Sequence, residues 1–228
     1  NALLEQTLKP HEVIFSDDGS NDNTIEIIKK NAEIFKNKNI KKILVLNEHS
    51  GPGKSRNIGM QNATGEWFAF LDSDDTWEKN KLERISYYFK TNKNINVFLN
   101  WEKFYKNNNK IISLRHGQNY NLKENLTEQL YKRNFFSTSA VVIHRSIYSK
   151  FGGFDEFLPN AQDYDYWLKI STGVRLFIIN EFLGNYYETK GNITQRPYRK
   201  KINSLLKISY RYKNNVRYFL FIKKLLQL

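Results

Sequence analysis

The sequence predicts an α/β protein in which a mainly parallel, doubly wound sheet is flanked by helices and followed by a basic helical tail. Short apolar runs alternate with segments whose apolar residues recur every three or four positions, as strands alternate with helices. Two of the runs end in acidic turns, where a parallel sheet would gather its functional loops. With 228 residues, 40% of them hydrophobic, the chain can bury a sizeable core.

The first half of the chain alternates regularly between the two patterns. A short apolar run is followed by a polar turn, and then by apolar residues with helical spacing. The Gly-Pro-Gly break at 51–53 separates the next strand from its helix. The predicted strands cover residues 12–16, 41–47 and 66–71, and the predicted helices cover residues 25–35, 54–63 and 81–91.

The second half is less regular. Beyond Asn100 the pattern loosens into polar sequence, which we interpret as surface loop. The predicted elements are strands over 94–100 and 138–144, a helix over 163–172, and a strand or strand pair over 175–187. We place an α/β domain at residues 1–195 and the tail at residues 196–228.

The formal net charge of +13 is concentrated in the tail. Residues 196–228 contain ten Lys or Arg and no Asp or Glu, whereas residues 1–195 contain 26 basic and 23 acidic residues. The tail also carries an apolar stripe with helical spacing. This pattern is typical of a helix lying on an anionic membrane surface, and equally of a helix packed on its own domain or on a partner.

Composition narrows the environment and the partners. The chain has no cysteine, which excludes disulfides, thiolate metal sites and a cysteine nucleophile. No apolar run is long enough to span a bilayer, and residues 1–9 lack the layout of a secretion signal. We expect a cytoplasmic protein, soluble or peripheral on the inner face of the cytoplasmic membrane. We expect no nucleic-acid partner, because the basic excess is confined to the tail and no stacking motif occurs.

Two carboxylate clusters follow predicted strands, and their mutual repulsion suggests that a cation lies between them. Asp72 and Asp74, on either side of the small Ser73, offer the oxygen ligands that Mg²⁺ or Mn²⁺ prefers, together with phosphate oxygens and water. Asp75 is a further candidate ligand. An isolated D-x-D sequence is, however, more often a solvated turn and helix cap.

The other cluster, at residues 17–20, also has two interpretations. Its Asp-Asp-Gly-Ser sequence suits an Asx turn, with the residues that follow capping the next helix. Alternatively, the Asp18 carboxylate accepts a hydrogen bond from the N–H of a nucleotide base, while Gly19 lets the ligand approach the backbone closely.

Between the clusters, Lys54 and Arg56 lie at a predicted helix start. Cations beside free backbone N–H groups suit a diphosphate or a base carbonyl. The segment is not a Walker loop, because the lysine comes too early. The alternative is a basic helix turn on the surface.

Three stretches resemble, in order, the motifs of the family 2 inverting glycosyltransferases of the GT-A fold. They read E-V-I-F-S-D-D-G-S, N-E-H-S-G-P-G-K-S-R-N-I-G and G-E-W-F-A-F-L-D-S-D-D. The likeness continues through F-G-G-F-D-E at 151–156 and Q-D-Y-D-Y-W-L-K at 162–169, so it covers about residues 1–194. It implies transfer of a sugar, with inversion, from a UDP-sugar to a hydroxyl of a glycan or lipid-linked glycan, in cell-surface polysaccharide or lipooligosaccharide synthesis.

The resemblance implies roles for the binding residues. Asp18 would contact the uracil, and Arg56 the base or diphosphate, with Lys54 beside it. Asp72 would contact the ribose or the metal. Asp74 would hold the Mg²⁺ or Mn²⁺ that bridges the two phosphates.

The resemblance makes Asp163 the general base that takes the proton of the acceptor hydroxyl. From the residues alone, Asp163 is better explained as the N-cap of the helix that carries Trp167. The family usually has an acid directly before this position, whereas this chain has Gln162.

The start of the chain departs further from the family pattern. Family domains open with a strand that ends in a Pro-x-Tyr/Phe-Asn loop beside the base, whereas residues 1–10 look like the middle of the next helix. We therefore expect a sheet that lacks one member and a nucleotide pocket that lacks one wall, from a truncated sequence or a weakened site.

Two other functions remain open. A sugar-nucleotide nucleotidyltransferase would need a glycine-rich Arg/Lys loop after the first strand, in the region that is missing here. A non-catalytic module that binds membranes or nucleic acid would use the acidic clusters only as caps. Binding of UDP rather than UTP, and its dependence on Mn²⁺, would distinguish the three.

Overall fold

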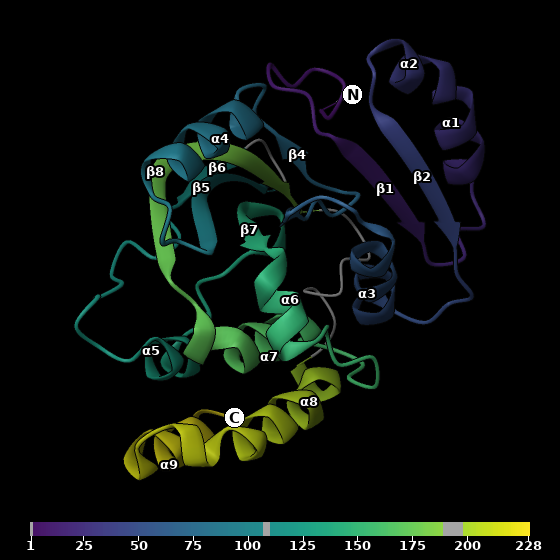
Figure 1. Ribbon diagram of the computed structural model, residues 1–228. Coiled ribbons are helices and arrows are strands. Elements are labelled where there is room, and N and C mark those ends of the chain that lie inside the picture. The colour runs from purple at the N-terminus through teal and green to yellow at the C-terminus, as the bar shows by residue number, and fades with distance from the viewer. Residues whose placement is uncertain (1, 107–109, 189–197) are drawn as a thin grey trace.

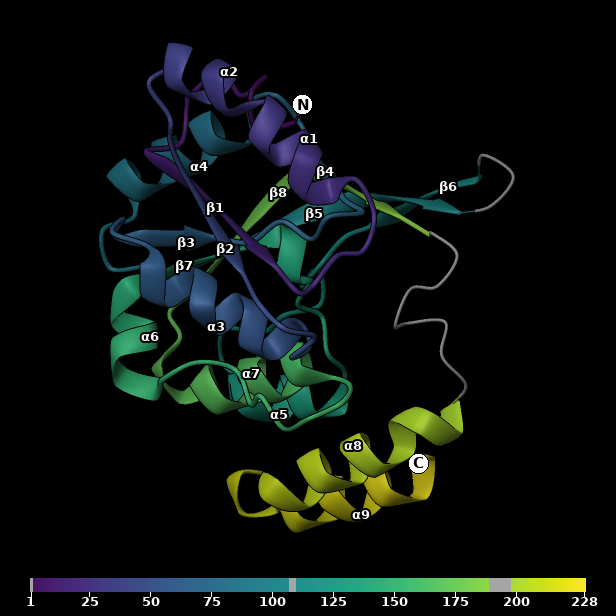
Figure 2. The ribbon, with the colours of Figure 1, turned by 90° about the vertical axis from the view of Figure 1, so that its right-hand side faces the viewer.

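The computed structural model describes residues 2–106, 110–188 and 198–228, in which helices flank two β-sheets (Figures 1 and 2). The α/β class is confirmed, and each predicted strand of the first half is present, but the helix predicted over residues 25–35 is divided at Asn31 into two helices. The elements up to residue 91 are β1 (Glu12–Asp17), α1 (Thr24–Lys30), α2 (Ala32–Asn37), β2 (Lys41–Leu46), α3 (Pro52–Asn62), β3 (Trp67–Ala69), β4 (Thr76–Trp77) and α4 (Lys81–Thr91). The later elements are β5 (Val97–Lys106), β6 (Lys110–Leu114), α5 (Leu126–Lys132), β7 (Val141–His144), α6 (Arg145–Phe151), α7 (Gln162–Ile170), β8 (Leu176–Tyr187), α8 (Tyr198–Arg211) and α9 (Tyr218–Gln227).

The directions of the strands are more mixed than predicted. β1 pairs with β2, and β5 with β8, in parallel. The remaining pairs of the larger sheet, which has the order β3-β7-β5-β8-β4 with β6 on β5, are antiparallel. The expectation of a mainly parallel sheet is corrected here. One reason is that the polar sequence after Asn100 extends β5 and returns as β6 after a connection too short for a parallel crossover.

β1 and β2 form a small sheet of their own. Within the described residues, β1 makes no strand pair with β3, and a cavity of about 1980 Å³ is lined by Phe15 on one side and Phe68 on the other. Glu12 of β1 joins the two parts, because its carboxylate accepts hydrogen bonds from the backbone N–H groups of Thr64, at 2.6 Å, and Gly65, at 2.9 Å.

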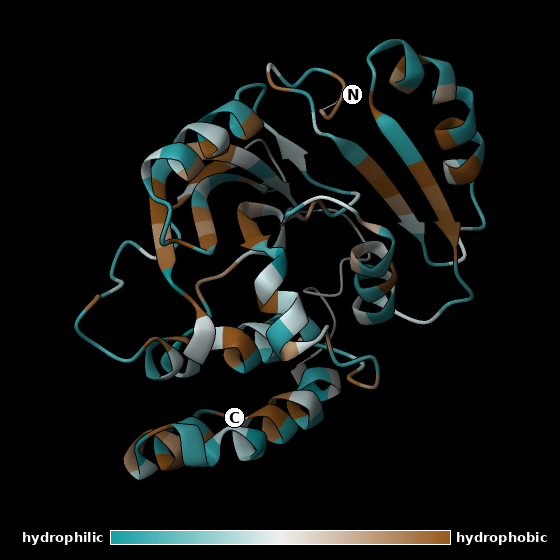
Figure 3. Cartoon of the chain, in the orientation of Figure 1, coloured by the Kyte–Doolittle hydropathy of each residue, from teal (hydrophilic) through white to brown (hydrophobic). Residues whose placement is uncertain are grey.

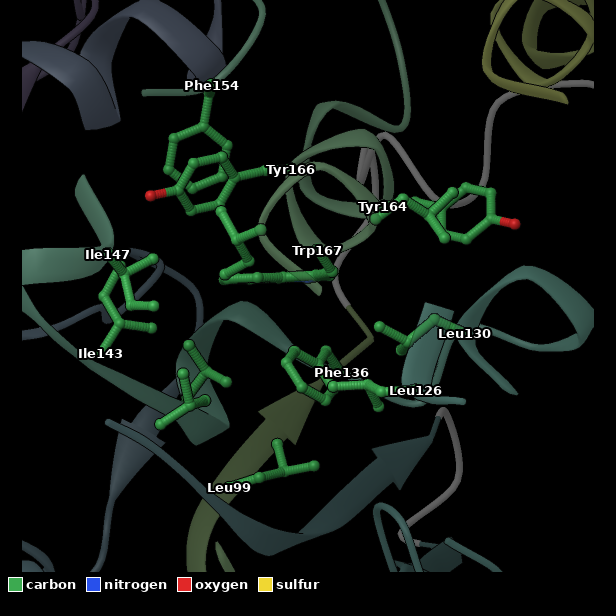
Figure 4. Packing of buried hydrophobic residues seen from close by; sticks show 14 of the residues in the cluster. Leu99, Leu126, Leu130, Phe136, Ile143, Ile147, Phe154, Tyr164, Tyr166 and Trp167 are labelled. Atoms are coloured by element: carbon green, nitrogen blue, oxygen red, sulfur yellow. The ribbon is translucent and has the colours of Figure 1, made fainter. Parts of the chain in front are cut away.

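Most apolar side chains lie between the larger sheet and helices α5 to α7. Figure 3 shows hydrophobic residues along the strands and on parts of the helices, with mostly hydrophilic residues in the loops. Figure 4 shows the centre of the main core, where Phe154 stacks on Tyr166 with ring centroids 4.1 Å apart and Trp167 is fully buried. A separate small cluster of Val13, Phe35 and Ile40 holds α2 against the small sheet. The core therefore fixes α7 firmly.

The tail forms two helices, α8 and α9, which pack on the domain. Ile208 and Leu220 are buried in the main core, and the Tyr131 hydroxyl donates to the carbonyl of Ser209 at 3.0 Å. Part of the apolar stripe is thus buried against the domain, as the second interpretation of the tail predicted. No described helix is long and apolar enough to cross a membrane. The predicted boundary at residues 195 and 196 lies outside the described residues.

Candidate functional site

The cavity gathers most of the predicted site residues. Asp18, Arg56, Asp72, Asp74 and Asp163 all line it, although they lie far apart in the sequence. Lys54, in the first turn of α3, is half-buried and does not line it. The structure therefore brings together every predicted site residue except Lys54.

Arg56 is the positive centre of this group. Its guanidinium donates a hydrogen bond to the Asp72 carboxylate at 2.7 Å. Burial disfavours the charged form, but the nearby carboxylates, Asp72 first and then Asp163 and Asp74, more than compensate and raise the pKa of Arg56. A permanent cation therefore lies among three acidic side chains that would otherwise repel one another.

The acids in the loop of residues 72–75 differ in burial, although all of them line the cavity. Asp72 and Asp74 are half-buried and line the cavity. Asp75 is buried, its carboxylate accepts a hydrogen bond from the backbone N–H of Tyr187 at 3.3 Å, and burial raises its pKa to about 7. The cap interpretation of this loop is wrong, because the N-cap of α4 is Asn80. Asp75 therefore ties the loop to the end of β8.

The chemistry of Asp72 and Asp74 fits a hard divalent cation. Among the described residues, no group of three or more His, Asp or Glu is placed to hold an ion. A Mg²⁺ or Mn²⁺ ion commonly takes only one or two carboxylates, with the substrate phosphates and water as its other ligands. Asp72 and Asp74 are thus enough for an ion that binds together with a diphosphate.

Asp17 and Asp18 have different roles. The Asp17 carboxylate accepts from the backbone N–H groups of Gly19 and Ser20 at 3.0 and 2.9 Å, which confirms the Asx turn. The Asp18 carboxylate accepts from the backbone N–H groups of Ser50 at 2.7 Å and Gly51 at 2.9 Å. Asp18 therefore ties the end of β1 to the loop before α3, at the edge of the cavity.

Asp163 lies in the first turn of α7 and is not its N-cap. The N-cap is Ala161, so the capping interpretation of Asp163 is wrong. Burial raises the pKa of Asp163, and the charge of Arg56 only partly offsets this. Gln162, in place of the family's acid, is buried and donates to the carbonyl of Leu158 at 2.7 Å. The Asp163 carboxylate therefore lines the cavity, with a pKa raised by burial.

Sequence reasoning missed a buried polar group behind the loop of residues 72–75. Glu102 of β5 has no exposed surface, lies 2.9 Å from Nε2 of His116, and lines the cavity with it. Burial would raise the pKa of Glu102, but His116 and Lys81 lower it overall. The available signal was a carboxylate two positions after Asn100, on the same buried face of a strand that begins with the apolar residues 97–99.

Lys81 completes this group. It is fully buried, and its ammonium donates to the carbonyl of Ser139 at 2.6 Å. Burial lowers the pKa of Lys81 to about 7, although Glu102 and Asp75 act in the opposite direction. Ser139 also receives the backbone N–H of Asp72 on its hydroxyl at 3.1 Å. Lys81 therefore supports the loop of residues 72–75 through Ser139.

The chain is similar to known glycosyltransferases along most of its length. It is 29% identical over 217 residues to an uncharacterized glycosyltransferase of Methanocaldococcus jannaschii, which covers 93% of this chain and 73% of that protein. Over 84 residues it is 37% identical to a Bacillus subtilis protein named as a teichuronic acid biosynthesis glycosyltransferase, which covers 37% of this chain and 32% of that protein.

Solved structures share the fold. Staphylococcus aureus TarS 1–349 in complex with UDP-GlcNAc matches 93% of this chain and 61% of its own, with a TM-score of 0.71 and 21% identity. A mannosyltransferase from Pyrobaculum calidifontis in complex with GDP-Man and Mn²⁺ matches 95% of this chain and 59% of its own, with a TM-score of 0.66 and 18% identity. The GT-A fold is thereby confirmed. The model of glycosyl transferase family 2 matches residues 1–152, two thirds of the chain, and the chain therefore belongs to that family.

Proposed function

We propose that this chain transfers a sugar, with inversion, from a UDP-sugar to a hydroxyl group of a glycan or lipid-linked glycan acceptor. The observation that supports this most strongly is the position of Arg56 among Asp72, Asp74 and Asp163 at one cavity. Diphosphate binding and proton removal need a cation and a carboxylate on opposite sides of one carbon atom. The named relative in teichuronic acid synthesis suggests an acceptor in a cell-surface glycan.

Each residue has a part in the proposed reaction. Asp163 takes the proton of the acceptor hydroxyl, whose oxygen attacks the anomeric carbon on the face opposite the diphosphate. The bond from that carbon to the diphosphate oxygen breaks, and UDP leaves with its electron pair. Arg56 binds the diphosphate. A Mg²⁺ or Mn²⁺ ion on Asp72 and Asp74 would neutralise the charge that develops there.

The nucleotide-binding residues are assigned on the same basis. Asp18 lies at the cavity edge at the end of β1, where a further N–H donor from a uracil could reach its carboxylate, which already holds the loop at Ser50. A carboxylate can accept about four hydrogen bonds, so both roles are compatible. Lys54, which does not line the cavity, would attract the diphosphate from a greater distance.

Calorimetric titration tests this proposal. We expect UDP to bind at least about tenfold more tightly in Mn²⁺ than in EDTA, and more tightly than GDP or UTP. Asp74→Asn should remove most of the effect of Mn²⁺, whereas Glu33→Gln, an exposed acid on α2, should not. Release of UDP from a panel of UDP-sugars then identifies the donor. No binding of UDP, or UDP binding indifferent to Mn²⁺ and to Asp74, would overturn the assignment.

A further inference from the structure

The outward face of the tail carries large apolar side chains that the domain leaves uncovered. The inner side of the same helices is occupied, because Ile208 and Leu220 are buried in the main core. The outer side has no covering element among the described residues (Figures 1 and 2). The uncovered side chains are Tyr210 (53% exposed), Tyr218 (75%), Phe219 (55%) and Leu226 (84%).

These side chains lie on both helices of the tail, and Tyr210 and Tyr218 contact the same buried ring of Phe221 near the turn between α8 and α9. The ring of Phe221 lies 5.3 Å from that of Tyr210 and 6.4 Å from that of Tyr218. Phe219 and Leu226 are two helical turns apart, so they lie on the same side of α9. We call this group, with the lysines at 207, 213 and 223, the tail surface.

Cations surround the rings. The Lys213 ammonium lies 5.9 Å from the ring of Tyr210. The Arg217 guanidinium lies 5.0 Å from the ring of Phe219 and is paired with the Glu128 carboxylate at 2.8 Å. Lys207, Lys213 and Lys223 are exposed, and no described carboxylate forms an ion pair with them. The sequence contains no acid after Glu188. The tail surface is therefore both apolar and strongly positive.

We propose that the tail surface binds the headgroup layer of an anionic lipid membrane. Aromatic rings with polar tips favour the boundary between headgroups and acyl chains, and lysines beside them attract anionic lipids. The exposed side chains of Leu226 and Phe219 would insert at this boundary. Nucleic acid is less suited, because bases would stack on the rings but gain nothing from Leu226. A second copy is less suited because the two sets of lysines would repel each other.

The inner side of the tail shows what this attachment would do. Lys201, Leu205 and Lys224 line the same cavity as Asp163. A membrane on the outer side of these helices would therefore lie across the tail from this part of the cavity wall. This consequence for a lipid-linked acceptor rests on the proposed function, but the membrane contact itself does not.

Co-sedimentation with vesicles tests the membrane contact without any nucleotide. The full chain should sediment with vesicles of phosphatidylglycerol and phosphatidylcholine in equal parts, and remain in solution with phosphatidylcholine alone. Replacing Lys207, Lys213 and Lys223 together by Gln should lower the partition constant by roughly 100-fold. Replacing Phe219 and Leu226 by Ser should lower the partition constant by about tenfold. This loss should depend less on salt concentration than the loss in the lysine variant.

Matched controls come from α1 and α2 at the far side of the molecule. Replacing Lys29, Lys30 and Lys36 by Gln removes the same charge, and Ile27→Ser removes an apolar side chain that is 57% exposed. Neither control should change the partition constant. The unfolding curve of each variant should match that of the parent, because every replaced side chain is exposed.

The outcomes are distinct. Failure of the parent chain to bind anionic vesicles, or equal loss in the control variants, overturns the proposal. Oligonucleotide binding that displaces the vesicles would identify nucleic acid as the partner instead, and a dimer abolished by Phe219→Ser would identify a second copy. UDP binding is measured separately, so failure here leaves the proposed sugar transfer standing, and the reverse also holds.

Discussion

Asn57 and Phe154 are joined by two hydrogen bonds between a side chain and a backbone. The backbone N–H of Phe154 donates to Oδ1 of Asn57 at 2.7 Å, and Nδ2 of Asn57 donates to the carbonyl of Phe154 at 3.0 Å. Nδ2 also donates to the Glu156 carboxylate at 2.8 Å. Asn57 directly follows Arg56 in α3, and the loop leads into α7. The contact therefore sets the position of Arg56 relative to Asp163.

Gly153 makes this contact possible. A Cβ atom added there would lie 2.1 Å from Oδ1 of Asn57. We expect Gly153→Ala to lower the free energy of unfolding by about 1–3 kcal/mol, and to weaken UDP binding because α3 must shift. Gly59→Ala in the same helix is the control, since nothing lies within 4 Å of its added Cβ. It should be neutral or stabilise by about 0.5–1 kcal/mol. Equal urea midpoints for the two variants would contradict this account.

Replacing Asp163 by Asn separates chemistry from binding. The amide cannot take the acceptor proton, so the turnover number should fall by about 10²- to 10⁴-fold. UDP affinity should be nearly unchanged, because Arg56 keeps its partner Asp72. Steady-state rates and calorimetry on the same preparation check both. Turnover close to that of the parent would remove Asp163 as the base.

Arg211 anchors the tail to α7. It donates to the Asp165 carboxylate at 2.7 Å and to that of Asp155 at 2.7 Å, and the Asp165 side chain is only 1% exposed. Arg211→Met leaves this buried acid without its cation, which should cost about 2–3 kcal/mol in urea unfolding, a reduced figure because Arg211 is partly exposed.

A double-mutant cycle checks the assignment to this pair. Asp165→Asn should recover part of the loss when it is added to Arg211→Met, because the uncompensated charge is gone. Additive effects of the two substitutions would show that the loss arises elsewhere.

Buried Lys81 predicts how stability depends on pH. Its pKa is lowered from 10.5 to about 7, so the unfolded chain holds a proton that the folded chain has released. Through Lys81, the free energy of unfolding should therefore rise with pH between about 7 and 10, by at most about 1.4 kcal/mol per pH unit. Asp75, with a pKa raised to about 7, contributes a fall with pH, but below this window. Lys81→Met should remove the rise, and urea midpoints across the window measure it. A parent chain with a flat profile there would contradict the prediction.

The alternating first half was predictable because its signals are local. The strands end in turn residues, and the helices show regular apolar spacing, as between Ile25 and Phe35. Two short helices, α5 and α6, were missed. Each is only seven residues long and owes its start to one side chain, Asn125 for α5 and His144 for α6, which accepts a backbone N–H bond. Such short helices depend on tertiary packing more than on pattern.

The site was only partly predictable, for a related reason. The acids at 18, 72, 74 and 163 could be selected because they recur in motifs with a fixed order. The roles of Asp75 and Lys81 depend on which side chains lie behind a loop, and this is decided by contacts between distant segments. The hydrogen bond from the backbone N–H of Ser50 to Asp18 could not be predicted either, because every residue except proline has this donor.

Because β1 and β3 belong to separate sheets, the cavity lies between the two sheets. Asp18 follows a strand of the small sheet, whereas Asp72 follows β3 of the larger sheet. A ligand that contacts both residues would bridge the two sheets. Without a ligand, Glu12 still joins them through its hydrogen bonds to the backbone of Thr64 and Gly65. Ligand binding in the cavity and the separation of the two sheets should therefore be coupled.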